Sequence, residues 1–245
     1  MVLEDHRKAL DLLFDPITRL FASVNPNVIS FFSLVFAVGA GVMFALSDRW
    51  VDEIGGGRYP WLILIALGMI ILNSIADTLD GRIARHTGRT SKVGDFLDHT
   101  FDRLSDMAIL IGIALSIYCN TIFGLIALSF VLLASYMGTQ SQAVGGGRNY
   151  RGIMGRADRM VMLMFITAFQ FVVEAGWAQK GITEPIFGFE IIPMEVAMGL
   201  MLVGGGVTVL MRGYDTYKYL AAEEVREREE EMRRGRPGRG KRARP

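Results

Sequence analysis

Long apolar stretches alternate with short polar ones along most of this 245-residue chain. Apolar runs near the length of a bilayer span recur at about 28–46, 122–137, 160–173 and 191–211. Two further runs border a polar segment: one starts near residue 60 and continues into it, and the other leaves it near residue 94 and ends near 118. Runs of this length and spacing predict an all-α integral membrane protein with six transmembrane helices.

The two ends of the chain have a different pattern. In residues 3–23, apolar side chains such as Leu10, Phe14 and Ile17 recur at helical spacing opposite charged ones. This favours an amphipathic helix in the membrane interface, with a soluble helix packed on the domain as the alternative. Residues 221–245 are charged and low in complexity, which predicts a disordered tail near anionic headgroups. We therefore divide the chain into an interfacial helix (1–24), a six-helix domain (25–220) and a tail (221–245).

Composition and charge fit a membrane protein. The chain is 51% hydrophobic with a mean hydropathy of +0.33, which is too apolar for an ordinary soluble domain. Arginines and lysines gather in 82–92, in 148–159 and after the last span, whereas the predicted polar loops 47–59 and 174–190 are acidic or mixed. The positive-inside rule then puts both termini on the cytoplasmic side of the cell membrane. The single cysteine, Cys119, excludes an internal disulfide, and we expect no nucleic-acid partner.

The polar segment 73–106 interrupts the apolar pattern with four aspartates at helical spacing. Asp77 and Asp80 are three residues apart, and Asp98 and Asp102 are four apart, so each pair shares one helix face. Four ionised carboxylates facing lipid would cost on the order of 10 kcal/mol. We therefore expect them to face a polar cavity with a neutralising cation. A turn over 86–92 would join two antiparallel helices and bring the pairs together.

Oxygen ligands without cysteine favour Mg²⁺ or Mn²⁺ over zinc. Two such ions about 3.5–4 Å apart form a clamp for in-line displacement at phosphorus. His99 lies about 100° around the helix from Asp98 and is expected to be non-catalytic. Asp106 is expected to bind a nearby base rather than a metal. Structural ion pairing of the aspartates with Arg82, Arg85 and Arg103 is the alternative interpretation.

The full pattern is Asp77-x-x-Asp80-Gly81-x-x-Ala84-Arg85, eight residues, then Gly94-x-x-x-Asp98-x-x-x-Asp102. It resembles the signature of the CDP-alcohol phosphotransferase family at all eight fixed positions. The resemblance implies a six-helix homodimer that uses two Mg²⁺ or Mn²⁺ ions at the cytoplasmic face. It also implies that an acceptor hydroxyl attacks the β-phosphorus of a CDP-linked lipid and that CMP leaves.

The resemblance also implies roles for particular residues. Asp77, Asp80 and Asp98 would be metal ligands, and Asp102 would bind the second metal and act as the general base. The CDP-alcohol would be held by seven residues from two regions: Asn27, Ser30, Gly81, Ala84, Arg85, Ser91 and Gly94.

The acceptor is predicted from basic residues outside the pattern. Arg156 and Arg159 resemble the start of the fifth helix in prokaryotic phosphatidylinositol-phosphate synthases and their archaetidyl relatives, and Arg212 fits a base late in their sixth helix. Those enzymes carry a base soon after Ser-Tyr in the fourth helix, whereas Ser135-Tyr136 is followed by Met-Gly-Thr-Gln. Inositol phosphate and glycerol phosphate therefore both remain open. An enzyme that makes a soluble phosphodiester and a membrane transporter are the alternative functions.

Overall fold

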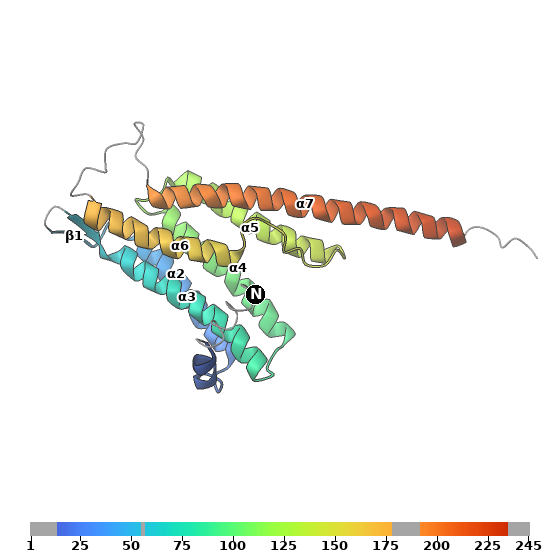
Figure 1. Ribbon diagram of the computed structural model, residues 1–245, viewed down its shortest axis with the longest axis horizontal. Helices are drawn as coiled ribbons and strands as arrows, with labels where there is room; N and C mark the ends of the chain where they lie inside the picture. Colours follow the sequence, from blue (N-terminus) through green and yellow to red (C-terminus); the bar gives the residue numbers. More distant parts are fainter. Residues whose placement is uncertain (1–13, 55–56, 178–191, 235–245) are drawn as a thin grey trace, which may run out of the picture.

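The computed structural model describes residues 14–54, 57–177 and 192–234 (Figure 1). Nearly all of this part is helical, which confirms the all-α prediction at the level of the fold. The long helices are α2 (Pro26–Ala45), α3 (Trp61–His86), α4 (Lys92–Ala114), α5 (Thr121–Ala143), α6 (Arg156–Val172) and α7 (Pro193–Arg234). A short π-helix, η1 (Val173–Trp177), continues α6. Residues 14–20 are also helical, and the rest of the predicted interfacial helix lies outside the described residues.

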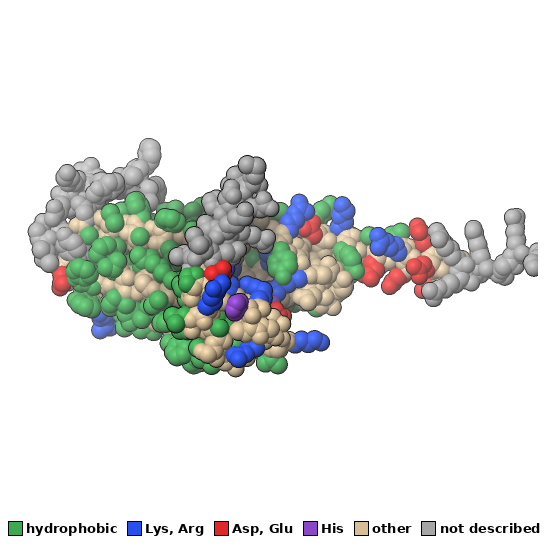
Figure 2. All heavy atoms as spheres, turned by 60° about the horizontal axis from the view of Figure 1, so that its bottom comes forward, with side chains coloured by type: hydrophobic (Ala, Val, Ile, Leu, Met, Phe, Trp, Pro, Cys, Tyr) green, Lys and Arg blue, Asp and Glu red, His purple; other side chains and the backbone are tan. Residues whose placement is uncertain are grey.

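Each predicted span corresponds to one long helix. Among the described residues, α2, α3, α5 and α7 are long and apolar enough to cross a membrane. That α4 and α6 also cross it stays a prediction, because the first half of α4 is charged and α6 has only 17 residues. Hydrophobic side chains cover much of the surface at one end of the molecule, and charged ones gather toward the other end and on projecting α7 (Figure 2).

The six helices pack as a closed ring. α2 contacts α3 and α4, α3 contacts α6, α6 contacts α7, α7 contacts α5, and α5 contacts α4. α3 and α4 do not pack along their length: they diverge from their short connection (Figure 1), and α2 packs against both. The buried core includes Phe44, Ile70, Ile109, Leu163 and Met198, which come from five helices of the ring.

Small residues let α2 and α4 cross closely. A Cβ atom built on Gly112 would lie 2.2 Å from the carbonyl oxygen of Gly41, and one on Gly41 would lie 2.2 Å from the carbonyl oxygen of Ala108. A second close approach lies at Gly205 of α7, since a Cβ atom there would lie 3.2 Å from the backbone of Phe130 on α5. Glycine removes the side chain that would otherwise separate these backbones.

Side chains fix where the site helices begin. The Asn25 side chain accepts a hydrogen bond from the Asn27 amide at 3.0 Å, and Ser91 Oγ accepts one from the Gly94 amide at 3.0 Å. These are ordinary N-caps of α2 and α4. The connection from α3 to α4 over residues 87–91 confirms the predicted turn. Between α4 and α5, burial raises the pKa of the Cys119 thiol to about 11, which suits a structural residue.

Two predicted irregular segments are regular. The loop predicted at 47–59 contains an antiparallel hairpin of β1 (Val51–Ile54) and β2 (Gly57–Pro60), in which Asp52 is opposite Tyr59. Valine, isoleucine and tyrosine favour strands, and the polar composition hid this signal. The tail predicted to be disordered from residue 221 is instead helical up to Arg234, because alanine, glutamate and arginine favour helix. Residues 235–245 lie outside the described part.

Candidate functional site

The two acidic pairs converge although their helices do not pack together. Arg156 Nη1, at the start of α6, lies 2.6 Å from Asp77 Oδ2 on α3 and 2.7 Å from Asp102 Oδ1 on α4. Asp80 is 5% exposed and accepts a hydrogen bond from Ser30 Oγ of α2 at 2.5 Å. α2 and α6 thus supply side chains to the site that the two acidic pairs form on α3 and α4, as the predicted roles of Ser30 and Arg156 required.

A pocket of about 210 Å³ lies beside the carboxylates. All seven residues predicted to hold the CDP-alcohol line it, together with Asp80 and Asp98; the seven are Asn27, Ser30, Gly81, Ala84, Arg85, Ser91 and Gly94. Arg89 and Thr90 line it as well. From the sequence, Arg89 is predicted only as part of the basic segment 82–92, but its place in the connecting turn brings it to the pocket.

The glycines of the pattern keep this pocket open. A Cβ atom on Gly81 would lie 3.2 Å from Arg85 Nη1, and one on Gly94 would lie 3.2 Å from Ser91 Oγ and 3.4 Å from Asn27 Oδ1. Contacts this short would force the polar side chains to move. Ser91 has two roles: its hydroxyl caps α4, and its side chain lines the pocket.

Asp106 organises the arginines next to the site. Its side chain is 1% exposed, and its carboxylate lies 2.7 Å from Arg159, 3.5 Å from Arg103 and 3.6 Å from Arg156. The expectation that Asp106 binds nearby bases is borne out. Arg159, predicted to bind the acceptor, is 5% exposed and directed at Asp106. Removing the charge of Asp106 would leave buried guanidinium groups without their counter-charge.

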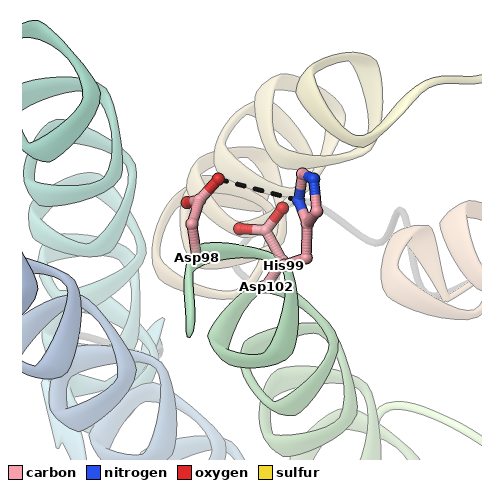
Figure 3. A group of neighbouring side chains, drawn as sticks. All are labelled: Asp98, His99 and Asp102. Carbon is pink, nitrogen blue, oxygen red and sulfur yellow. Dashed lines mark ion pairs between the residues drawn. The ribbon is translucent and has the colours of Figure 1, made fainter. Parts of the chain in front are cut away.

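His99 lies closer to the acids than its position on the helix suggested. Its Nδ1 is 3.7 Å from Asp98 Oδ2, and ligand atoms of Asp98, His99 and Asp102 all lie within 4.8 Å of one another (Figure 3). The expectation that the ring points away was wrong, because an imidazole can reach back over its own turn. His99 also hydrogen-bonds with Arg148, from the connection between α5 and α6.

Arg212, on α7, is bound mainly by backbone oxygens. Its Nη1 donates to the carbonyl of Ala134 at 2.5 Å, and its Nε donates to the carbonyl of Arg151 at 2.8 Å. A Cβ on Gly138 would lie 3.0 Å from Arg212 Nη1, so that glycine makes room for the guanidinium. These contacts hold Arg212 near α5, at the side of the site where Arg148 enters.

The donor set fits a hard divalent cation. Ligand atoms of Asp98 and Asp102 lie in one small cluster. Asp77 and Asp102 both contact Arg156. Carboxylate oxygens from α3 and α4 therefore reach a common region. Carboxylate oxygens are the ligands that Mg²⁺ and Mn²⁺ prefer, and His99 adds a nitrogen that manganese tolerates. His99 thus lies with two of the four aspartates that were predicted as metal ligands.

Comparison with known proteins adds family information. A family model described as CDP-alcohol phosphatidyltransferase matches residues 23–206. An archaetidylinositol phosphate synthase of Pyrococcus horikoshii is 32% identical over 149 residues, which cover 61% of this chain and 72% of that protein. A phosphatidylinositol phosphate synthase of Cutibacterium acnes is 26% identical over 223 residues, which cover 86% of this chain and 95% of that protein.

Solved structures share the fold. The phosphatidylinositol phosphate synthase of Mycobacterium tuberculosis with CDP-DAG bound superposes with a TM-score of 0.61 at 23% identity, covering 82% of this chain and 92% of that one. The same enzyme in complex with manganese and citrate gives a TM-score of 0.62 at 22% identity, covering 82% of this chain and 88% of that one.

Proposed function

Because the chain belongs to the CDP-alcohol phosphatidyltransferase family, we propose that it transfers a phosphatidyl or archaetidyl group from a CDP-linked lipid to a phosphorylated alcohol. The acceptor is inositol phosphate or glycerol phosphate, and CMP is released. The acceptor hydroxyl oxygen forms a bond to the β-phosphorus, the bond from that phosphorus to the CMP oxygen breaks, and the hydroxyl proton passes to a carboxylate. Membership of an enzyme family sets aside the transporter alternative.

The observation that carries this proposal is the shared pocket beside the carboxylates. Residues from the start of α2 and from both halves of the pattern line it, and Asp80 and Asp98 form its acidic side. We infer that the nucleotide lies against Gly81, Ala84 and Gly94. Arg85 then binds the diphosphate in the two-pronged way that guanidinium groups bind phosphates. The CDP-DAG complex of the mycobacterial relative supports a CDP-linked lipid as the donor.

We propose that Asp77, Asp80, Asp98 and Asp102 hold two Mg²⁺ or Mn²⁺ ions, with His99 adjacent. When bound, the ions would neutralise the diphosphate and make its β-phosphorus more electrophilic. Asp102 is proposed to accept the proton of the acceptor hydroxyl, since its carboxylate is mostly buried and lies in one cluster with Asp98. The manganese complex of the mycobacterial relative supports a divalent ion of this class.

We propose that Arg156 and Arg212 bind the acceptor phosphate, with Arg159 held in support by Asp106. The finer topology is also part of the proposal: six membrane crossings, a homodimer, and a site that opens on the cytoplasmic side of the cell membrane. It is supported by the basic segments 82–92 and 148–159, which lie at the same end as the site.

The test is CMP release by the purified protein in detergent. CDP-diacylglycerol or CDP-archaeol is supplied with Mg²⁺ and a panel that contains inositol phosphate, glycerol phosphate, free inositol and serine. We expect CMP only with a phosphorylated acceptor. We expect Asp102→Asn to lower kcat by about 100-fold or more, the usual contribution of a general base. Asp48→Asn, an exposed aspartate beyond the other end of α2, is the matched control. Absence of CMP with every acceptor would refute the proposal.

A further inference from the structure

The second half of α5 has no base of its own, yet arginines from other elements gather against it. α5 (Thr121–Ala143) contains no lysine or arginine. Arg103 of α4 donates to Ser135 Oγ at 2.5 Å, and Arg212 of α7 donates to the neighbouring carbonyl of Ala134 at 2.5 Å. One turn of α5 therefore seats two guanidinium groups that come from two other helices.

Arg148 reaches the same region from the connection between α5 and α6. Its guanidinium lies over the Tyr150 ring, 5.1 Å from the centroid, and hydrogen-bonds with His99. His99 Nδ1 in turn lies 3.7 Å from Asp98. A single imidazole ring therefore separates Arg148 from the predicted metal-binding carboxylates, although the sequence places them about 50 residues apart.

Two arginines in this region have no carboxylate partner among the residues that the structure describes. Asp106 pairs with Arg103 and Arg159, and Asp77 and Asp102 pair with Arg156. Arg148 and Arg212 are half-buried, and neither has a carboxylate within 4.0 Å in the described part of the chain. Arg103, Arg148 and Arg159 lie close enough to Arg212 for their charges to act on it. Partly buried guanidinium groups without a paired carboxylate favour a bound anion.

We propose that Arg148 determines acceptor specificity: with Arg212, it binds the phosphate group of the acceptor. This inference rests on the proposed function and adds to it a residue outside every helix of the site. A phosphate monoester carries close to two negative charges at neutral pH, and two guanidinium groups can each bind it through paired N–H donors. The phosphate then lies across His99 from the carboxylates, and the attached alcohol is directed toward Asp102.

The test compares Arg148→Gln with Arg151→Gln in CMP-release kinetics. Arg151 belongs to the same connection, is well exposed, and pairs with Asp215 at 2.9 Å. We expect Arg148→Gln to raise KM for the phosphorylated acceptor by about 10- to 100-fold, the effect of losing one charged hydrogen-bonding partner. KM for the CDP-lipid and the thermal midpoint should stay near wild type. Arg148→Lys should restore part of the acceptor affinity, and Arg151→Gln should change neither KM.

The outcomes separate the inference from the proposed function. If the wild-type protein uses a phosphorylated acceptor and Arg148→Gln leaves its KM unchanged, or raises both KM values equally, the inference is overturned and the proposed function stands. If the wild-type protein uses no phosphorylated acceptor, both fall. Weaker thermal stabilisation of the Mg²⁺-loaded Arg148→Gln protein by the phosphorylated acceptor, relative to Arg151→Gln, would support the inference independently of turnover.

Discussion

Any cation that Asp77 and Asp102 bind must compete with Arg156, because one nitrogen of that residue lies within 2.7 Å of both carboxylates. Removing the guanidinium should therefore tighten divalent-ion binding. We predict that Arg156→Gln binds Mn²⁺ about tenfold more tightly, an effect well within the interaction energy of charges at this separation. The same variant should lose activity, because Arg156 is also proposed to bind the acceptor. Mn²⁺ titration followed by electron paramagnetic resonance measures the affinity.

Arg151→Gln is a suitable control for the loss of one positive charge, because its partner Asp215 lies outside the acidic pairs. Unchanged or weaker Mn²⁺ binding by Arg156→Gln would show that these carboxylates do not form the ion site, whatever the activity of that variant.

Single residues were predictable from sequence where local spacing decides their position. The spacing of Asp98 and Asp102 predicts a shared helix face, and the structure places both beside the site. Spacing could not locate Arg148, which depends on the path of a connection between two helices. His99 was misjudged for a related reason: angle around the helix describes Cβ directions, and it does not describe where a long side chain ends.

At the scale of elements, the crossing of α2 and α4 places Asn27 beside Gly94, since a Cβ atom on Gly94 would lie 3.4 Å from Asn27 Oδ1. We predict that Gly112→Ala lowers the thermal midpoint in detergent by several degrees, because its Cβ would lie 2.2 Å from the carbonyl oxygen of Gly41. Overpacking of this kind typically costs about 1–3 kcal/mol. Activity should fall as well, since separating α2 from α4 moves Asn27 away from Gly94, and both residues line the pocket. Circular dichroism on heating and CMP release measure the two effects.

Gly68→Ala on α3 is the matched substitution, because a Cβ atom there meets no atom within 4 Å. Alanine favours helix over glycine by up to about 1 kcal/mol, so this variant should be as stable as the wild type or more stable. Equal stability of the Gly112 and Gly68 variants would mean that the crossing is not tightly packed.

The apolar runs predicted the helices themselves, but they did not predict which helices pack against each other. Sequence adjacency suggested that α3 and α4 form a pair, whereas the ring inserts α2 against both and uses α6 to bridge their carboxylates. Hydrophobic periodicity describes one helix at a time, so it cannot give the order of helices around a ring. The extension of α7 to Arg234 was missed because charged, repetitive composition predicts both disorder and exposed helix.

At the scale of the whole molecule, the site requires only the part of α7 that contacts the rest of the ring. Arg212 donates to the carbonyls of Ala134 and Arg151, and Tyr219 lies against Gly146 after α5, whereas residues 223–232 are almost entirely exposed. We predict that a chain ending at residue 220 keeps its CMP-release activity within about twofold and its thermal midpoint in detergent, because surface segments without packing contacts contribute little to stability. A chain ending at residue 211 should lose both, since it lacks Arg212 and the Tyr219 contact. If the chain ending at residue 220 is as inactive as the chain ending at residue 211, the projecting part of α7 is needed for activity. The ring of helices alone would then not account for the activity.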